Sequence, residues 1–228
     1  MKTSQYILLS FLGFVFAATL VLFADSKNGE KVNGNVFGET IPETRLEAFS
    51  VIVAEKKANI TIKNDSVNSM SALLFQTDSV FQLPEYKIIN DTLFISKSGY
   101  AAKTIIKCHA VKTIIGRSNS NIQLGNYKTD SLSIYLDKSR VNGWIKNSPM
   151  DFVTIEALNK SNLSLTFNRS SINMSKLKAD NSSVNFFNNN SSINQVSAVL
   201  SSKANMRLVR PVKLDVNCDP SSRYWINN

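Results

Sequence analysis

The sequence predicts an all-β protein, a parallel β-helix or β-solenoid with coils of about 20 residues, preceded by one N-terminal hydrophobic helix. The prediction depends on a long apolar segment at the start, on short β-branched runs between polar turns, and on a repeat that begins near residue 117. We divide the chain into a signal peptide or membrane anchor at 1–24, a linker at 25–44 and a β-solenoid domain at 45–228.

The apolar segment runs from Tyr6 to Phe23 and contains only one serine, one glycine and one threonine. As an α-helix, its length at about 1.5 Å per residue is roughly 27 Å, close to the ~30 Å thickness of a bilayer's hydrocarbon core. Whether this segment is cleaved off stays open, because Leu22 stands where a cleavable signal peptide prefers a small residue. We expect export to the periplasm or cell surface, with the segment as a removable signal or a retained anchor.

Glycines, a proline and charged residues make residues 25–44 typical of a linker. The folded domain begins after it. Short runs rich in β-branched residues and bounded by polar turns predict strands at Phe49–Val53, Ala58–Ile62 and Thr92–Ile95.

Five serine-led units then follow one another, with their first serines 19, 22, 21 and 20 residues apart. The units are Ser120–Leu124, Ser139–Gly143, Ser161–Leu165, Ser182–Phe186 and Ser202–Met206. A second short strand follows about half a period later in each unit, at Leu132–Ile134, Val153–Ile155, Ile172–Met174, Ile193–Gln195 and Val212–Leu214. Each coil therefore carries at least two strands.

Alternation along a strand sorts the repeat positions onto two faces. The apolar face carries Ile122, Val141, Leu163, Val184 and Ala204. The opposite face carries Asn121, Arg140, Asn162, Ser183 and Lys203. One coil cannot bury its apolar face alone, so the pattern predicts stacked coils, with serine and asparagine at the corners in columns of like residues.

An antiparallel β-sandwich is the alternative, because it also produces many short strands at 8–12-residue spacing. The half-period spacing fits either fold. The likeness between strands one full unit apart favours the solenoid, since a sandwich does not require it.

These features resemble the auto-transporter adhesin family with a head GIN domain, found in envelope proteins of Bacteroidetes-type bacteria. The likeness covers about residues 46–217 and lies in the apolar segment, the early strand pair, the strand Asp91–Ile95 and the Ser/Asn-led repeats. Members usually lead their repeats with Gly-Ser-Gly-Asp, whereas residues 118–121 read Ser-Asn-Ser-Asn. The resemblance implies a right-handed β-helical, extracytoplasmic domain and offers no catalytic residues.

The net charge is +9, from 26 Lys and Arg against 17 Asp and Glu. Clustered positive charge would indicate a nucleic-acid or anionic-surface partner. Here the lysines, from Lys63 to Lys176, are dispersed among polar positions without a basic run or interleaved aromatic residues. We therefore expect a solvated surface and no nucleic-acid partner.

Cys108 and Cys218 are the only cysteines, and they show no metal-ligand spacing, so no metal site is expected. An oxidising compartment would permit a disulfide between them, but spacing alone leaves that question open. His109 is the only histidine. Because adjacent strand residues point to opposite faces, Cys108 and His109 are not expected to form a nucleophile–base pair.

Glycan-cleaving β-helix enzymes would need paired carboxylates about 5–9.5 Å apart. The acidic residues of the repeats fall at different phases, which favours solvated turn positions. They are Asp130, Asp137, Asp151, Glu156 and Asp180. No phosphate-binding loop or calcium nonapeptide is present, and no cofactor is expected.

Aromatic residues are the remaining candidates for ligand contact. We name Trp144, Tyr127 and Tyr135 as candidate ligand-binding residues. Trp144 follows Gly143, where the repeat expects a hydrophobic residue, so we expect its side chain to point outward.

The sequence thus indicates a non-enzymatic module of the cell envelope, adhesin-like or scaffolding, with an unknown ligand. Envelope proteins or surface glycans are the expected partners, and residues 6–23 are the expected membrane contact. A β-helix protein that binds or cleaves a glycan is the alternative, and an envelope sensor is a third interpretation.

Overall fold

The structure is a computed structural model that describes residues 43–74, 84–96, 102–109 and 111–227. They belong to one compact unit, Gly38–Asn228. The predicted N-terminal helix, the segment 1–24 and nearly all of the linker at 25–44 lie outside the described residues. Among the described residues, no helix is long and apolar enough to cross a membrane.

All regular structure in the described residues is β-structure. The strands are β1 (Thr44–Arg45), β2 (Val51–Glu55), β3 (Asn59–Asn64), β4 (Ser69–Leu74), β5 (Tyr86–Ile89), β6 (Thr92–Ser96), β7 (Ala102–Cys108), β8 (Thr113–Arg117), β9 (Asn121–Tyr127), β10 (Ser131–Asp137), β11 (Arg140–Lys146), β12 (Pro149–Leu158), β13 (Asn162–Asn168), β14 (Ser171–Asp180), β15 (Ser183–Asn189), β16 (Ser192–Ser201), β17 (Asn205–Val209), β18 (Lys213–Cys218) and β19 (Arg223–Asn227). The three strands predicted before residue 100 correspond to β2, β3 and β6.

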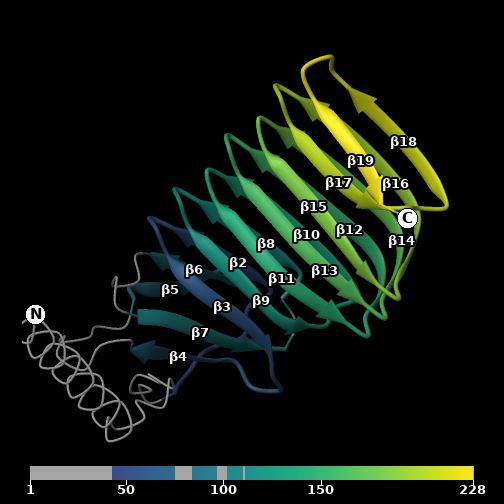
Figure 1. Cartoon of the computed structure of the whole chain (residues 1–228). Coiled ribbons are helices and arrows are strands. Elements are labelled where there is room, and N and C mark those ends of the chain that lie inside the picture. Colours follow the sequence, from purple (N-terminus) through teal and green to yellow (C-terminus); the bar gives the residue numbers. More distant parts are fainter. Residues whose placement is uncertain (1–42, 75–83, 97–101, 110, 228) are drawn as a thin grey trace, which may run out of the picture. The chain divides into compact units, whose positions relative to one another are not determined.

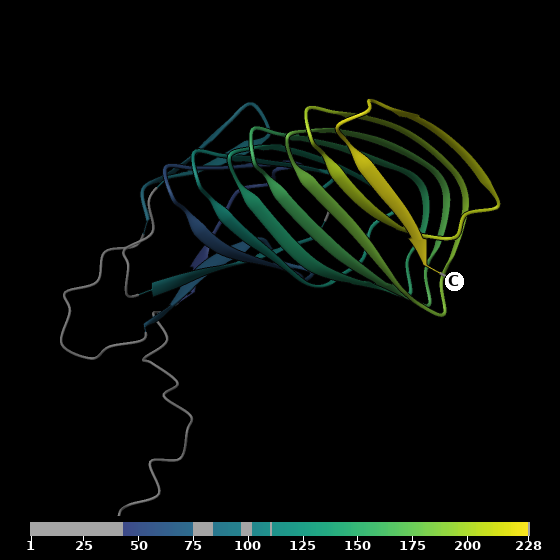
Figure 2. The ribbon, with the colours of Figure 1, turned by 45° about the horizontal axis from the view of Figure 1, so that its top comes forward.

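The strands form two sheets (Figure 1). Sheet A has the order β1-β4-β7-β3-β9-β11-β13-β15-β17-β19. Sheet B has the order β18-β16-β14-β12-β10-β8-β2-β6-β5. From β8 to β17 the chain alternates between the two sheets and makes about five regular turns, which Figure 2 shows as successive loops of ribbon.

Parallel pairing within each sheet confirms the predicted solenoid and excludes the antiparallel sandwich. In sheet A, Val141 pairs with Ile122 on one side and with Leu163 on the other, and Leu163 pairs with Val184. These are equivalent positions of successive units. Each unit therefore stacks directly on the next.

The N-terminal end departs from this order. Strands β2 and β3 pair with β8 and β9 on one side and with β6 and β7 on the other. The coil formed by β2 and β3 therefore lies between the regular repeats and the coil formed by β6 and β7, although β2 and β3 come first in the chain. Antiparallel strands complete this end, with β5 beside β6, and with β4 and then β1 beside β7.

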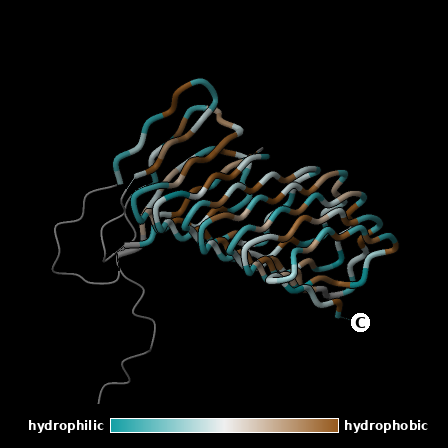
Figure 3. Tube along the Cα trace, turned by 90° about the horizontal axis from the view of Figure 1, so that it is seen from above, coloured by the Kyte–Doolittle hydropathy of each residue, from teal (hydrophilic) through white to brown (hydrophobic). Residues whose placement is uncertain are grey.

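The predicted apolar face forms the core. Ile122, Val141, Leu163 and Val184 are all completely buried. Figure 3 shows hydrophobic and hydrophilic positions alternating along the coils, as a sheet with one buried face requires. Between coils, the rings of Phe167 and Phe186 pack edge to face with their centroids 5.0 Å apart.

The last repeat is shifted by two residues from the predicted alignment. Met206, and not Ala204, pairs with Val184. Ala204 is buried at the corner, where the earlier coils carry a serine. The side-chain faces stay as predicted because a shift of two residues preserves the strand alternation.

Each coil has two corners, which we name by the direction of the chain. At corner A the chain passes from sheet B to sheet A, and a buried small residue follows the turn. The corner A column consists of Ala58, Ser120, Ser139, Ser161, Ser182, Ala204 and Ser222. At corner B the chain returns to sheet B, and the corresponding column is Thr129, Ser148, Ser170 and Ser191.

Hydrogen bonds join the serines of a column from coil to coil, which confirms the predicted columns. At corner A, the main-chain N–H of Ser139 donates to Ser161 Oγ (3.2 Å), and the N–H of Ser161 donates to Ser182 Oγ (3.1 Å). Ser120 Oγ donates to Ser139 Oγ at 3.1 Å. The hydroxyls thereby satisfy main-chain groups that the turns leave without a strand partner.

We expect Ser161→Ala to lower the free energy of unfolding by about 1–3 kcal/mol, because it leaves the buried N–H of Ser139 without an acceptor. Urea unfolding followed by circular dichroism measures the change. Ser164→Ala is the matched control, since Ser164 is a partly exposed outer residue of β13, the strand that follows Ser161, and loss of its hydroxyl should cost at most about 0.5 kcal/mol. Equal effects of the two substitutions would contradict a structural role for the serine column.

Candidate functional site

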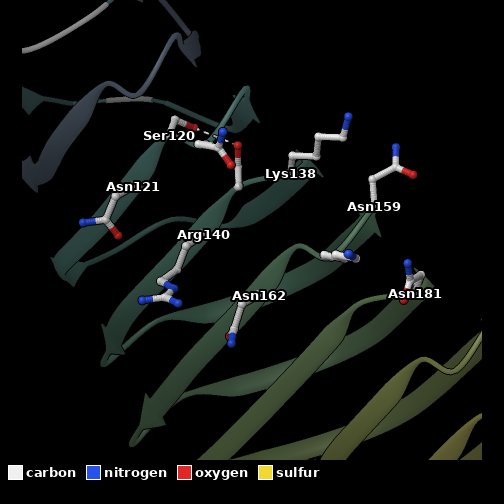
Figure 4. Close-up of a pocket in the computed structure, with 10 residues that line it drawn as sticks. Ser120, Asn121, Lys138, Arg140, Asn159, Asn162 and Asn181 are labelled. Carbon is white, nitrogen blue, oxygen red and sulfur yellow. Dashed lines mark hydrogen bonds between the residues drawn. The ribbon is translucent and has the colours of Figure 1, made fainter.

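A groove of about 590 Å³ runs across four successive turns at corner A (Figure 4). We call it the corner groove. It is lined by three cations, five asparagines and two serines: Lys138, Arg140, Lys160, Asn119, Asn121, Asn159, Asn162, Asn181, Ser120 and Ser139. No carboxylate is among these residues, so the groove offers hydrogen-bond donors and positive charge.

Backbone conformation at the turns produces this lining. Lys138, Asn159 and Lys160 have positive φ angles of 49°, 56° and 67°. Asparagine tolerates this left-handed region, whereas a lysine there costs roughly 1 kcal/mol or more. The lysines in this conformation among the described residues all lie at corner A, and they are Lys56, Lys57, Lys138, Lys160 and Lys203.

Side-chain hydrogen bonds order the groove. Ser120 donates to Ser139 at the base, as the dashed line in Figure 4 marks. At the rim, Asn159 Nδ2 donates to Asp137 Oδ1 at 2.7 Å. The carboxylate of Asp137, next to the groove, thus bonds to the rim amide. Lys138, Arg140 and Lys160 of the groove make no ion pair with any described residue.

Sheet B carries a second concavity, of about 690 Å³, that includes Arg117, Tyr135, Asp137 and Glu156. The register places Tyr135 beside Glu156, and Asp137 two residues further along. The spacing between strands and the rise along a strand place Asp137 and Glu156 diagonally across from each other, roughly 8 Å apart. The acidic residues predicted to fall at different phases therefore include one pair that shares a concavity.

Both members of this carboxylate pair have partners. Glu156 Oε1 accepts from Lys178 Nζ at 2.7 Å, and this contact raises the pKa of Lys178. Asp137 accepts from Asn159. The pair is thus held by a cation on one side and an amide on the other.

The three predicted ligand-binding residues do not come together. Trp144 lies on the outer face of sheet A and is 63% exposed, as its position after Gly143 predicts. Tyr135 lies on the outer face of sheet B and is 37% exposed. Tyr127 is buried in the core, where its hydroxyl donates to the Val111 carbonyl and burial raises its pKa, so it is not accessible to a surface ligand.

Cys108 points into the core and His109 is exposed, so the two side chains lie on opposite sides of the strand end. Burial raises the pKa of the Cys108 thiol to about 12, which leaves little of the reactive thiolate at neutral pH. Cys108 and Cys218 are both free, and they belong to strands near opposite ends of the stack. Among the described residues, no three His, Cys, Asp or Glu side chains are grouped to hold a metal ion.

Sequence reasoning missed the corner lysines. A signal was present, because Lys138 and Lys160 immediately precede Ser139 and Ser161, the serines that lead two of the repeats. Because both lysines hold the same position next to a corner serine, the repeat indicates that their side chains point outward on successive coils. Asparagine was the residue expected there.

Comparisons with known proteins support the fold. No family model and no curated sequence matches the chain. A crystallised protein from Bacteroides fragilis, described as a putative adhesin, superposes with a TM-score of 0.57 at 13% identity and covers 82% of this chain and 96% of its own.

Two further solved structures have lower TM-scores. A protein from Parabacteroides merdae, described as a putative adhesin, has a TM-score of 0.43 at 12% identity and covers 86% of this chain and 98% of its own. A protein from Parabacteroides distasonis, described as a putative lipid binding protein, has a TM-score of 0.45 at 11% identity and covers 85% and 94%. The likeness to the Bacteroides fragilis protein shows that the chain shares its fold.

Proposed function

We propose that this protein is an exported, non-catalytic module of the cell envelope that is adhesin-like and holds a ligand or partner on the outer faces of its solenoid. The observation that carries the proposal is the pair of continuous outer faces formed by the stacked coils. The fold that it shares with a protein described as a putative adhesin supports the proposal, as does the apolar segment Tyr6–Phe23 ahead of the domain.

The chemistry of the described side chains is consistent with binding without turnover. Cys108 is a buried thiol whose pKa is raised to about 12, and His109 faces away from it. Asp137 and Glu156 each accept a hydrogen bond from a neighbouring side chain. None of these groups is paired as nucleophile and base.

Localisation tests the envelope part of the proposal. The full-length chain with a C-terminal epitope tag is expressed in a Gram-negative host, and the cells are fractionated and treated with protease. We expect the tag in the membrane fraction and sensitive to protease from the extracytoplasmic side. About eighteen apolar residues, each contributing a few tenths of a kcal/mol, favour the bilayer over their few polar neighbours.

Deletion of residues 1–24 is the control, and it should leave the tagged domain soluble in the cytoplasm and protected in intact cells. Recovery of the untruncated chain in the cytoplasm would contradict export. The adhesin-like role that depends on export would then have to be abandoned.

A glycan-cleaving role is the second candidate, favoured by the concavity that holds Tyr135, Asp137 and Glu156. We expect no release of reducing ends from envelope polysaccharides, because both carboxylates are already bonded. If release is found, and Asp137→Asn or Glu156→Gln lowers it more than about tenfold without unfolding, the non-catalytic proposal is wrong.

A further inference from the structure

Charged residues are sorted between the two sheets. The strands of sheet A contain no Asp or Glu and eight Lys or Arg: Arg45, Lys63, Lys103, Lys107, Arg140, Lys146, Arg207 and Arg223. The strands of sheet B contain six acidic residues, Glu55, Asp137, Asp151, Glu156, Asp180 and Asp215, and five basic ones, Lys87, Arg117, Lys176, Lys178 and Lys213. Lys107 pairs with Glu43 and Asp65, which lie outside the strands, and the other seven cations of sheet A have no ion pair among the described residues. The strands of sheet A are therefore cationic, and those of sheet B are balanced.

Strand register turns the outer face of sheet A into rows of similar side chains. The first row is Asn59, Asn121, Arg140, Asn162, Ser183, Asn205 and Arg223. The second is Gln123, Asn142, Ser164, Asn185, Arg207 and Trp225, and it ends at Thr61, which is buried. Figure 4 shows Asn121, Arg140 and Asn162 side by side on neighbouring strands.

The length of these rows indicates a polymeric ligand. Neighbouring strands are about 4.8 Å apart, so a row of seven side chains extends over roughly 29 Å. A single sugar or a small anion would occupy only a few positions. A chain of several sugar units could contact the whole row.

The arginines of the two rows are available to a ligand. Arg140, Arg207 and Arg223 are exposed, and they make no ion pair or side-chain hydrogen bond with the described residues. An arginine fork binds a carboxylate with two parallel hydrogen bonds. The amides and hydroxyls between the arginines can donate to and accept from sugar hydroxyls.

Aromatic side chains border the same rows. Trp144 and Phe187 are exposed, and both pair with Thr166 on the strand between them. An exposed indole or phenyl ring offers a surface on which the apolar face of a sugar can pack. The corner groove, with Lys138 and Lys160, continues from Arg140 at the edge of the face and adds further positive charge.

We propose that the outer face of sheet A, with the corner groove at its edge, binds an acidic polysaccharide whose sugar carboxylates pair with Arg140, Arg207 and Arg223. This inference rests on the proposed function and names its ligand class. A nucleic acid or an anionic membrane would use the same positive charge but would not need the rows of amides. A neutral glycan would leave the arginines without partners.

The experiment measures binding of the full-length chain, in neutral detergent micelles, to polygalacturonate and to its methyl ester. The two polymers share a backbone, and only the first has free carboxylates. We expect binding to polygalacturonate that weakens as salt is added, and binding to the ester that is weaker by at least about tenfold. Equal binding to both polymers, or to neither, would overturn the proposal.

Two triple variants locate the site while removing the same net charge. Arg140→Gln with Arg207→Gln and Arg223→Gln should weaken polygalacturonate binding by at least about tenfold. The control, Arg117→Gln with Lys176→Gln and Lys213→Gln, removes three exposed cations of sheet B and should change it by less than about twofold.

Equal losses in the two triple variants would show that net charge alone attracts the polymer and would overturn the proposal. Duplex DNA or phosphatidylglycerol vesicles that compete as well as polygalacturonate would overturn it too. Protease accessibility in cells tests export independently, so a failure of polysaccharide binding in a correctly exported protein refutes the ligand and leaves the envelope role standing.

Discussion

Val184→Asp is expected to abolish folding. Val184 is completely buried in β15, between Leu163 and Met206 of the neighbouring coils. The substitution loses about 1.5–3 kcal/mol of apolar burial and adds roughly 2–7 kcal/mol for an unpaired polar group, even if the carboxyl is protonated. The sum is comparable to the whole stability of a domain, about 5–15 kcal/mol.

Thermal unfolding followed by circular dichroism measures this effect. Asn185→Asp is the matched control, because it places the same carboxylate on the outer face of the same strand and should leave a cooperative transition. A Val184→Asp protein that melts like the parent would show that the side-chain register of the coils is wrong.

Gly143→Ala is expected to have the second largest effect. A Cβ atom at this position would lie 2.6 Å from Leu124 Cβ, well inside van der Waals contact and against an atom that cannot move independently of its backbone. Either β9 or β11 must shift, which we expect to cost about 1–3 kcal/mol or more. The same crowding explains why a glycine occupies an inward position that other coils fill with leucine or phenylalanine.

Gly125→Ala provides the control in the neighbouring strand. The nearest atom to a Cβ there is Lys63 Cγ at 3.4 Å, the flexible side chain of an exposed residue, so the change should be within about 0.5 kcal/mol. Urea unfolding of the two variants compares them directly. A Gly143→Ala protein as stable as Gly125→Ala would mean that the strands accommodate the extra carbon without strain.

Local periodicity explains which parts of the fold could be predicted. Alternation places Val141 and Leu163 on the buried face whatever the partner strand is, and the repeat length then sets which strands stack. The position of the coil formed by β6 and β7 was not accessible in this way. It precedes the regular repeats, so no repeat phase relates it to the strands it pairs with.

The candidate site was predictable only residue by residue. The exposed position of Trp144 followed from its neighbour Gly143, a local feature of the repeat. The burial of Tyr127 did not, because a bulge next to Asn126, which has a φ of 50°, turns the strand end inward. That Asp137 and Glu156 share one concavity could be seen only from the strand register. The spacing of acidic residues along the chain does not reveal that register.

By itself the sequence determined the class of fold, the buried face and the serine corners, because these depend on spacing within one coil and its repetition. Only the tertiary structure decided how charge is distributed. Lysines and arginines that appear scattered along the chain are divided between two sheets, since alternate strands of each coil go to opposite sides of the core. Arg140, Arg207 and Arg223 are far apart in sequence and meet on one face, whose strands contain no Asp or Glu, because parallel stacking brings equivalent strand positions into register.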